Sequence, residues 1–157
     1  MPPRSGGGGP SFGLSVAQKL DPDWVEGPEG RAFVADVMGS WGEHPLTVVD
    51  ATSFDRADAD EAACQNRDRI SQNLGRILAK VCLGHPFGQV LAVGGDVLLA
   101  LLDALGTGKI RLLGEVARGV VASELRVRDG IIHVLSKSGG FGEEGLFLEL
   151  SGPHDAE

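Results

Sequence analysis

The chain has 157 residues and a mass of 16.4 kDa, the size of one ordinary domain. Apolar residues make up 42% of it, enough for a packed core. The longest apolar run, Val97–Leu102, is too short to span a membrane. The net charge of −8 argues against nucleic-acid binding, because a negative surface repels phosphate backbones.

The first ten residues carry one basic side chain and no apolar stretch behind it, so we expect no secretory signal. Two cysteines, Cys64 and Cys82, are too few for a disulfide framework. Free thiols are typical of a reducing compartment, which predicts a cytoplasmic protein. Composition divides the chain into a flexible segment at 1–10, an α/β domain at 11–150 and a frayed tail at 151–157.

The hydrophobic pattern changes along the domain from helical to extended spacing. Helices are predicted for four segments: 11–20, 27–40, 57–83 and 97–105. Ser11 or Ser15 would cap the first, Gly39 would end the second and Gly84 would end the third. Runs with strand character are 46–50, 89–93, 110–113, 119–123, 125–128, 131–136 and 146–150.

This order of elements predicts an α/β fold, a three-layer sandwich with a mostly parallel central sheet and a β-hairpin. The run 89–93 has almost no polar residue, as expected of a central parallel strand that is covered on both faces. Asp129-Gly130, placed between two alternating runs, predicts a type I′ hairpin turn.

A first glycine cluster, Gly94-Gly95-Asp96, stands between a predicted strand and a predicted helix. Glycines there could bring the backbone close to a bound nucleotide. They could also serve a sharp turn, with Asp96 as the cap of the following helix. The spacing alone favours this turn, because glycine pairs are common in turns.

A second cluster, SKSGGFG at 136–142, places Gly139, Gly140 and Gly142 after Lys137 and Ser138. Glycine-rich backbone exposes N–H groups that can cradle an anion, and the lysine adds positive charge. The spacing matches neither a Walker A sequence nor G-x-G-x-x-G, and a plain loop remains an equal alternative. Four scattered histidines show no metal-ligand spacing, and no catalytic residue can be assigned.

Three blocks in order, QVLAVGGDVLLALLDALG, LLGEVARGVVAS and IIHVLSKSGGFGEEGLF, resemble the C-terminal nucleotide-binding domain of the four-carbon acid sugar kinases. The resemblance covers roughly residues 70–150. It implies ATP, with Mg²⁺ bridging its phosphates, and phosphoryl transfer to a short sugar acid such as a threonate, an erythronate or a 3-oxo-tetronate. It also implies a partner, either a separate sugar-acid-binding chain or a homodimer mate.

The resemblance assigns nucleotide contacts to both glycine clusters. The implied cofactor-binding residues are Gly94, Gly95, Asp96, Ser138, Gly139, Gly140, Gly142 and, through the stretch GGPSFGLSVAQ at 8–18, Ser11. Glu115 and Gly119 match the family's "eiapG" block.

The chain also departs from the family pattern. Val97 and Leu98 replace a threonine and a serine after the first glycine pair, Val121 replaces a proline, and nothing in residues 1–60 resembles the family's substrate-binding half. Phosphoryl transfer requires both substrates to be positioned, and the substrate-binding half is not recognisable here, so two other hypotheses for the function remain. One is a non-catalytic relative that acts as an interaction or regulatory module, and the other is an unrelated α/β domain that binds another anion.

Overall fold

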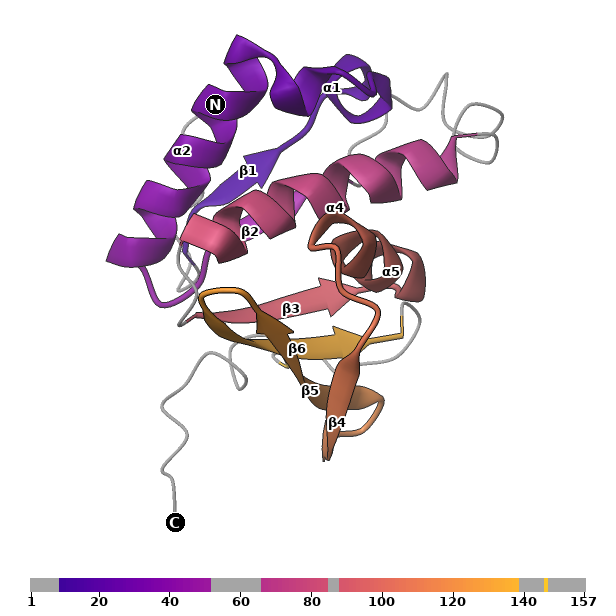
Figure 1. The fold of residues 1–157 in the computed structure, drawn as a ribbon. Coiled ribbons are helices and arrows are strands. Elements are labelled where there is room, and N and C mark those ends of the chain that lie inside the picture. The colour runs from indigo at the N-terminus through magenta and orange to yellow at the C-terminus, as the bar shows by residue number, and fades with distance from the viewer. Residues whose placement is uncertain (1–8, 52–65, 85–87, 139–145, 147–157) are drawn as a thin grey trace.

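The structure, a computed structural model, describes residues 9–51, 66–84, 88–138 and 146. A long helix separates a small sheet from a larger one (Figure 1). The elements in chain order are β1 (Ser11–Gly13), α1 (Val16–Leu20), the 3₁₀ turn η1 (Trp24–Glu26), α2 (Pro28–Glu43), β2 (Val48–Asp50), α4 (Arg67–Gly84), β3 (Gln89–Val93), α5 (Gly95–Ala104), β4 (Ile110–Ala117), β5 (Val120–Val127) and β6 (Gly130–Lys137). Across the described ranges, no helix is long and apolar enough to cross a membrane.

The larger sheet has the strand order β3-β6-β5-β4. Its β3–β6 pair is parallel, whereas β6–β5 and β5–β4 are antiparallel. The α/β class is therefore confirmed, but the prediction of a mostly parallel sheet is wrong for these four strands. Strands β4, β5 and β6 are joined by short turns, which can connect only antiparallel neighbours. Within the described part β3 is an outer strand with one neighbour, not a central strand.

The predicted hairpin is present between β5 and β6, with Val127 paired to Gly130 across a two-residue turn. The predicted type I′ turn centred on Asp129-Gly130 is wrong, because the two turn residues are Arg128 and Asp129, and no described residue other than glycine has a positive φ. Residues 119–123 and 125–128 were expected to form two strands, yet β5 is continuous. Glu124 stays in the ladder opposite His133, since its side chain points to the half-exposed face.

Helix α4 buries residues on two of its faces and so contributes to two hydrophobic cores. Ile77 and Val81 pack with Trp24 and Val34 beneath α2, whereas Ala79 and Cys82 pack against the larger sheet. Burial raises the pKa of the Cys82 thiol to about 12, so this cysteine stays protonated and unreactive at neutral pH. The helix ends at Gly84 as predicted, and the part of the prediction that covers 57–65 lies outside the described residues.

The N-terminal elements differ from the sequence prediction in two places. Residues 11–13 form a strand parallel to β2, and the helix begins only after Ser15, which caps α1 in a capping box with Gln18. Gly39 does not end α2, which continues to Glu43, because an exposed helical glycine costs only about 1 kcal/mol.

The face of the larger sheet that points away from α4 and α5 carries a third, smaller cluster of Val120, Leu135 and Leu146. A strand was predicted at 146–150. Its first residue, Leu146, is helical, so the prediction is wrong at this residue. The rest of that strand and the tail lie outside the described residues, as does most of the segment 1–10.

A buried lysine that the sequence analysis did not single out joins α1 to the end of β2. Lys19 is 0% exposed and its Nζ donates a hydrogen bond to the Ala51 carbonyl at 2.9 Å. Nearby, the amide of Asn73 in α4 donates to the carbonyls of Gln18, Lys19 and Asp21. Buried polar groups with such partners fix α1 to α4 and β2.

We expect Lys19 to give the protein a measurable pH dependence of stability. Burial lowers its pKa from 10.5, and the nearby Asp50 carboxylate only partly offsets that effect. Between the folded pKa and 10.5 the unfolded chain therefore binds more protons at this site, so its contribution to the free energy of unfolding rises with pH. Urea denaturation of wild type and Lys19→Met at pH 7.5 and near pH 10 should show wild type gaining stability relative to the variant. A difference that stays constant or falls with pH would contradict this.

Candidate nucleotide site

The two glycine clusters begin next to each other, at the carboxyl ends of two paired strands of the larger sheet. Strands β3 and β6 run parallel and end side by side, with Val93 opposite Lys137. The Gly94 N–H donates a hydrogen bond to the Lys137 carbonyl at 2.9 Å. The chain therefore leaves the sheet at two adjacent bends, where loops and ligands commonly meet in α/β sheets.

The first bend ends in the uncapped N-terminus of α5. Gly94 occupies the cap position with φ 101°, a conformation that glycine adopts readily, and no side chain accepts a hydrogen bond from the first turn. A Cβ atom on Gly94 or Gly95 would meet no other atom within 4 Å. Free N–H groups and the positive end of the helix dipole at an open surface suit an anion such as a phosphate.

Asp96 lies inside the first turn of α5, so the alternative in which it caps this helix is wrong. Its side chain is exposed. A carboxylate at this position stabilises the helix N-terminus, but it repels a phosphate placed directly beside it. An anion at this bend would therefore contact the N–H of Gly95, beside the bare Cα of Gly94, whose own N–H is already donated to the Lys137 carbonyl.

The two positions at which the family has hydroxyl groups carry apolar side chains that are partly buried. Leu98 packs against the core between α5 and the larger sheet, and Val97 is half-buried. These side chains cannot donate a hydrogen bond to a nucleotide. In this chain, main-chain N–H groups are the donors that the first bend offers.

The second bend begins with a buried lysine. Lys137 is 8% exposed and its Nζ donates to the Ser138 carbonyl at 3.2 Å, which holds the ammonium against the backbone of the bend. Ser138 is exposed. The predicted contacts at Gly139, Gly140 and Gly142 lie outside the described residues.

Of the remaining sequence candidates, the structure places Ser11 away from these bends and Gly119 beside the second one, because Gly119 directly precedes Val120, which pairs with Lys137. Ser11 belongs to β1 of the smaller sheet, where it pairs with Val48, and α4 lies between that sheet and the larger one (Figure 1). Glu115 accepts a hydrogen bond from the Gly119 N–H at 2.8 Å, which closes the turn between β4 and β5. In this chain the "eiapG" block therefore builds a hairpin. No group of three metal-binding side chains occurs in the described ranges.

Comparison with known proteins identifies the domain type. The family model of a nucleotide-binding C-terminal domain matches residues 10–147. A D-threonate kinase from Bordetella bronchiseptica is 33% identical over 121 residues, which cover 76% of this chain and 29% of that protein.

Solved structures agree with this assignment. A Bordetella bronchiseptica protein with a domain of unknown function, crystallised with bound citrate as a domain-swapped dimer, has a TM-score of 0.66 and 28% identity, covering 92% of this chain and 34% of its own. A Haemophilus influenzae protein at 18% identity has the same fold, with a TM-score of 0.66, and again 92% of this chain and 34% of that protein are covered.

This chain therefore spans about a third of the length of these relatives. The family match extends over nearly the whole described structure, and it includes both glycine bends at the ends of β3 and β6. The chain belongs to the family of C-terminal nucleotide-binding domains of four-carbon acid sugar kinases.

Proposed function

We propose that this domain binds ATP at the two bends, with the phosphates on the N–H of Gly95, packed against the bare Cα of Gly94, and on the loop that begins at Ser138. The observation that carries the proposal is the hydrogen bond from the Gly94 N–H to the Lys137 carbonyl, which fixes the two bends next to each other. The remaining assigned positions, Gly139, Gly140 and Gly142, follow directly in sequence.

The donor set suits phosphate oxygens better than a metal ion bound by the protein alone. The first bend offers N–H donors, which stabilise negative charge, and Asp96 is the one carboxylate in the first turn of α5. Bound together with ATP, Mg²⁺ would supply positive charge that screens the phosphates from the Asp96 carboxylate. When bound, the ion would neutralise charge on the transferred phosphoryl group.

The proposed reaction is phosphoryl transfer from ATP to a hydroxyl group of a four-carbon sugar acid of the threonate, erythronate or 3-oxo-tetronate type, in the cytoplasm. The D-threonate kinase relative supports this substrate class. These 157 residues cover 29% of that protein, and we propose that the sugar acid is held outside them, for example by a separate chain or by a homodimer mate. No residue of this chain is assigned to the chemical step.

A second candidate is a non-catalytic domain that keeps the fold and serves as an interaction or regulatory module. The apolar side chains of Val97 and Leu98, at positions where the family has hydroxyl groups, favour it. The two candidates differ in a simple respect, since only the first requires nucleotide affinity.

Isothermal titration calorimetry of the chain with ATP and Mg²⁺ tests the proposal. We expect a dissociation constant on the order of micromolar, which corresponds to about −8 kcal/mol. Sulfate at the same concentration should neither bind comparably nor displace ATP. With threonate added, these 157 residues alone should release no ADP, because they match only the nucleotide-binding domain of the relatives. An absence of heat with ATP would contradict the proposal and favour the non-catalytic module.

A further inference from the structure

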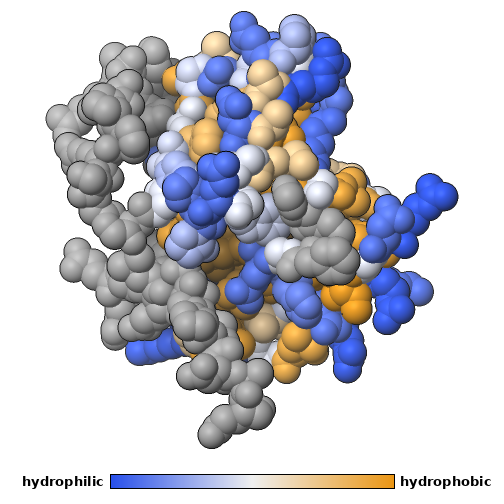
Figure 2. Space-filling view, turned by 90° about the vertical axis from the view of Figure 1, so that its left-hand side faces the viewer, coloured by the Kyte–Doolittle hydropathy of each residue, from blue (hydrophilic) through white to orange (hydrophobic). Residues whose placement is uncertain are grey.

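Lys137 carries a charge that the fold buries without a counter-charge. It is 8% exposed, and among the described residues it forms no ion pair. Lys19, the other buried lysine of the described residues, has the Asp50 carboxylate nearby. Charged side chains ordinarily remain in water, as Figure 2 shows for hydrophilic residues on the side of the molecule opposite the glycine bends. Burying an unpaired charge is costly, so a buried ammonium of this kind suits an anionic ligand.

The strand neighbours of Lys137 supply no negative charge. Val93 of β3 and Val120 of β5 pair with it directly, and Leu135 precedes it on the same face of β6. Its Nζ donates to the Ser138 carbonyl, a neutral acceptor, and this is its one hydrogen bond within the described part of the chain. Because an ammonium group has three N–H donors, donors remain for the oxygens of a ligand.

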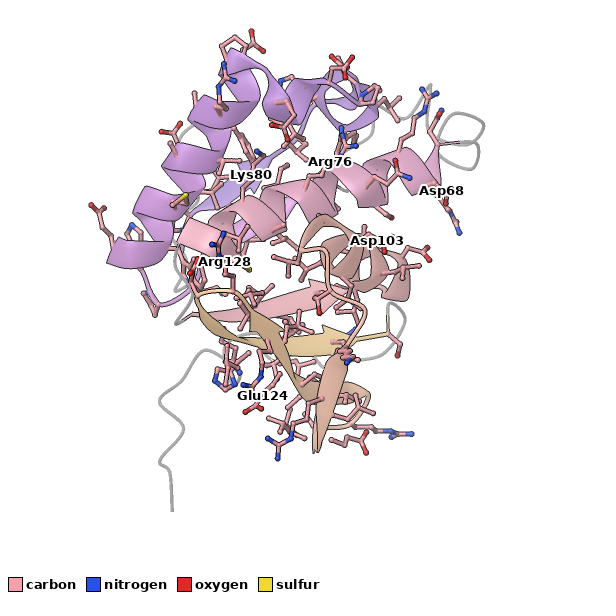
Figure 3. The ribbon with its side chains drawn as sticks, viewed as in Figure 1. Asp68, Arg76, Lys80, Asp103, Glu124 and Arg128 are labelled. Carbon is pink, nitrogen blue, oxygen red and sulfur yellow. The ribbon has the colours of Figure 1, made fainter. Side chains whose placement is uncertain are left out.

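The Lys137 side chain lies on the side of the sheet opposite to helix α5. Glu124 of β5 points away from α4 and α5 (Figure 3), and it pairs with His133 of β6. Lys137 lies an even number of residues beyond His133 in the same strand, so strand alternation directs it to the same side. Helix α5 packs on the other side and begins at Gly95. The ammonium and the Gly95 N–H therefore flank the paired ends of β3 and β6 from opposite sides.

We infer that Lys137 is the counter-charge of this site and binds oxygens of a phosphate chain, which in the proposed complex is that of ATP. The inference rests on the proposed function and adds a cationic side chain to its main-chain donors. A chain of phosphates lying across the strand ends can contact both the Gly95 N–H and the ammonium, whereas a nucleoside has no charge to offer. Lys137 therefore favours ligands with several phosphate groups over adenosine.

Lys137→Met tests the inference, because methionine keeps an unbranched side chain and removes the charge. Calorimetric titration of the 157-residue chain with ATP and Mg²⁺ should show binding that is at least about tenfold weaker than in wild type. Inorganic tripolyphosphate in place of ATP should show the same loss. Lys109→Met is the matched control and should keep wild-type affinity for both ligands. Lys109 is exposed and precedes Ile110, which pairs with Leu125 in the part of β5 remote from the bends.

Stability separates binding by Lys137 from a structural role. Replacing a buried charge that has no counter-charge with an apolar side chain is neutral or stabilising. Without ligand, the urea midpoint of Lys137→Met should therefore equal or exceed that of wild type. A lower midpoint would assign a structural role to the ammonium and would overturn the inference.

The two ligands distinguish failure of this inference from failure of the proposed function. If Lys137→Met binds ATP as tightly as wild type, the inference is overturned and the nucleotide site stands without this cation. If wild type binds tripolyphosphate but not ATP, and Lys137→Met loses that binding, the inference is upheld and the nucleotide proposal fails. If wild type binds neither ligand, both are overturned.

Discussion

Replacing Gly75 by valine should lower the free energy of unfolding by about 3 kcal/mol or more, the upper range for overpacking a core. Gly75 is buried within α4, where this helix crosses α5. A Cβ atom at this position would lie 2.5 Å from the Ala100 carbonyl carbon and 2.7 Å from its oxygen. Backbone atoms of a packed helix cannot rotate away, so the two helices would have to separate.

A pair of alanine substitutions separates this contact from helix propensity. Gly75→Ala should destabilise the protein despite the gain in propensity, whereas Gly39→Ala should stabilise it by about 0.5–1 kcal/mol. Gly39 is an exposed helical glycine whose Cβ would meet no atom within 4 Å. Urea denaturation gives both values. Ala100→Gly should rescue Gly75→Val only partly, because the backbone atoms of residue 100 remain, and a stabilising Gly75→Ala would contradict the close contact.

Elements that depend on local sequence were predictable, and elements that depend on distant neighbours were not. The helical spacing of apolar residues in the segment 57–83 predicted α4, and Gly84 predicted its end. The strand at residues 11–13 has only three residues and exists because it pairs with β2. No local pattern reveals such a pairing. The helix signals in residues 11–20 instead led to a predicted helix start at residue 11, before the true cap at Ser15.

The relative direction of the strands in the larger sheet was mispredicted for a related reason. The run 89–93 is apolar enough for a central strand, but its position depends on which strands pair with it, and β6 is its one described neighbour. The proximity of the two glycine bends was expected from family resemblance and not from spacing. The buried Lys19 was missed, because a lysine in the last turn of a short helix gives no sign that the fold will enclose it.

Introducing an aspartate at Gly95 should weaken ATP binding by at least about tenfold while leaving the fold intact. The carboxylate would stand at the first helical position of α5, where the proposed phosphates contact the main chain. A lost charge-assisted hydrogen bond alone is worth about 1.5–3 kcal/mol, which is roughly tenfold or more in affinity. The same carboxylate complements the helix dipole, so the stability of the protein should be unchanged or higher by about 0.3–1 kcal/mol.

Gly108→Asp is the matched control for this variant. Gly108 is exposed in the connection between α5 and β4, and a Cβ there would also meet no atom within 4 Å. Both variants change the net charge from −8 to the same extent, so a general electrostatic effect on ATP would appear in both. Calorimetric titration should show a loss of affinity for Gly95→Asp alone. Equal affinities in the two variants would show that the phosphates do not lie at the N-terminus of α5, even if the wild-type chain binds ATP.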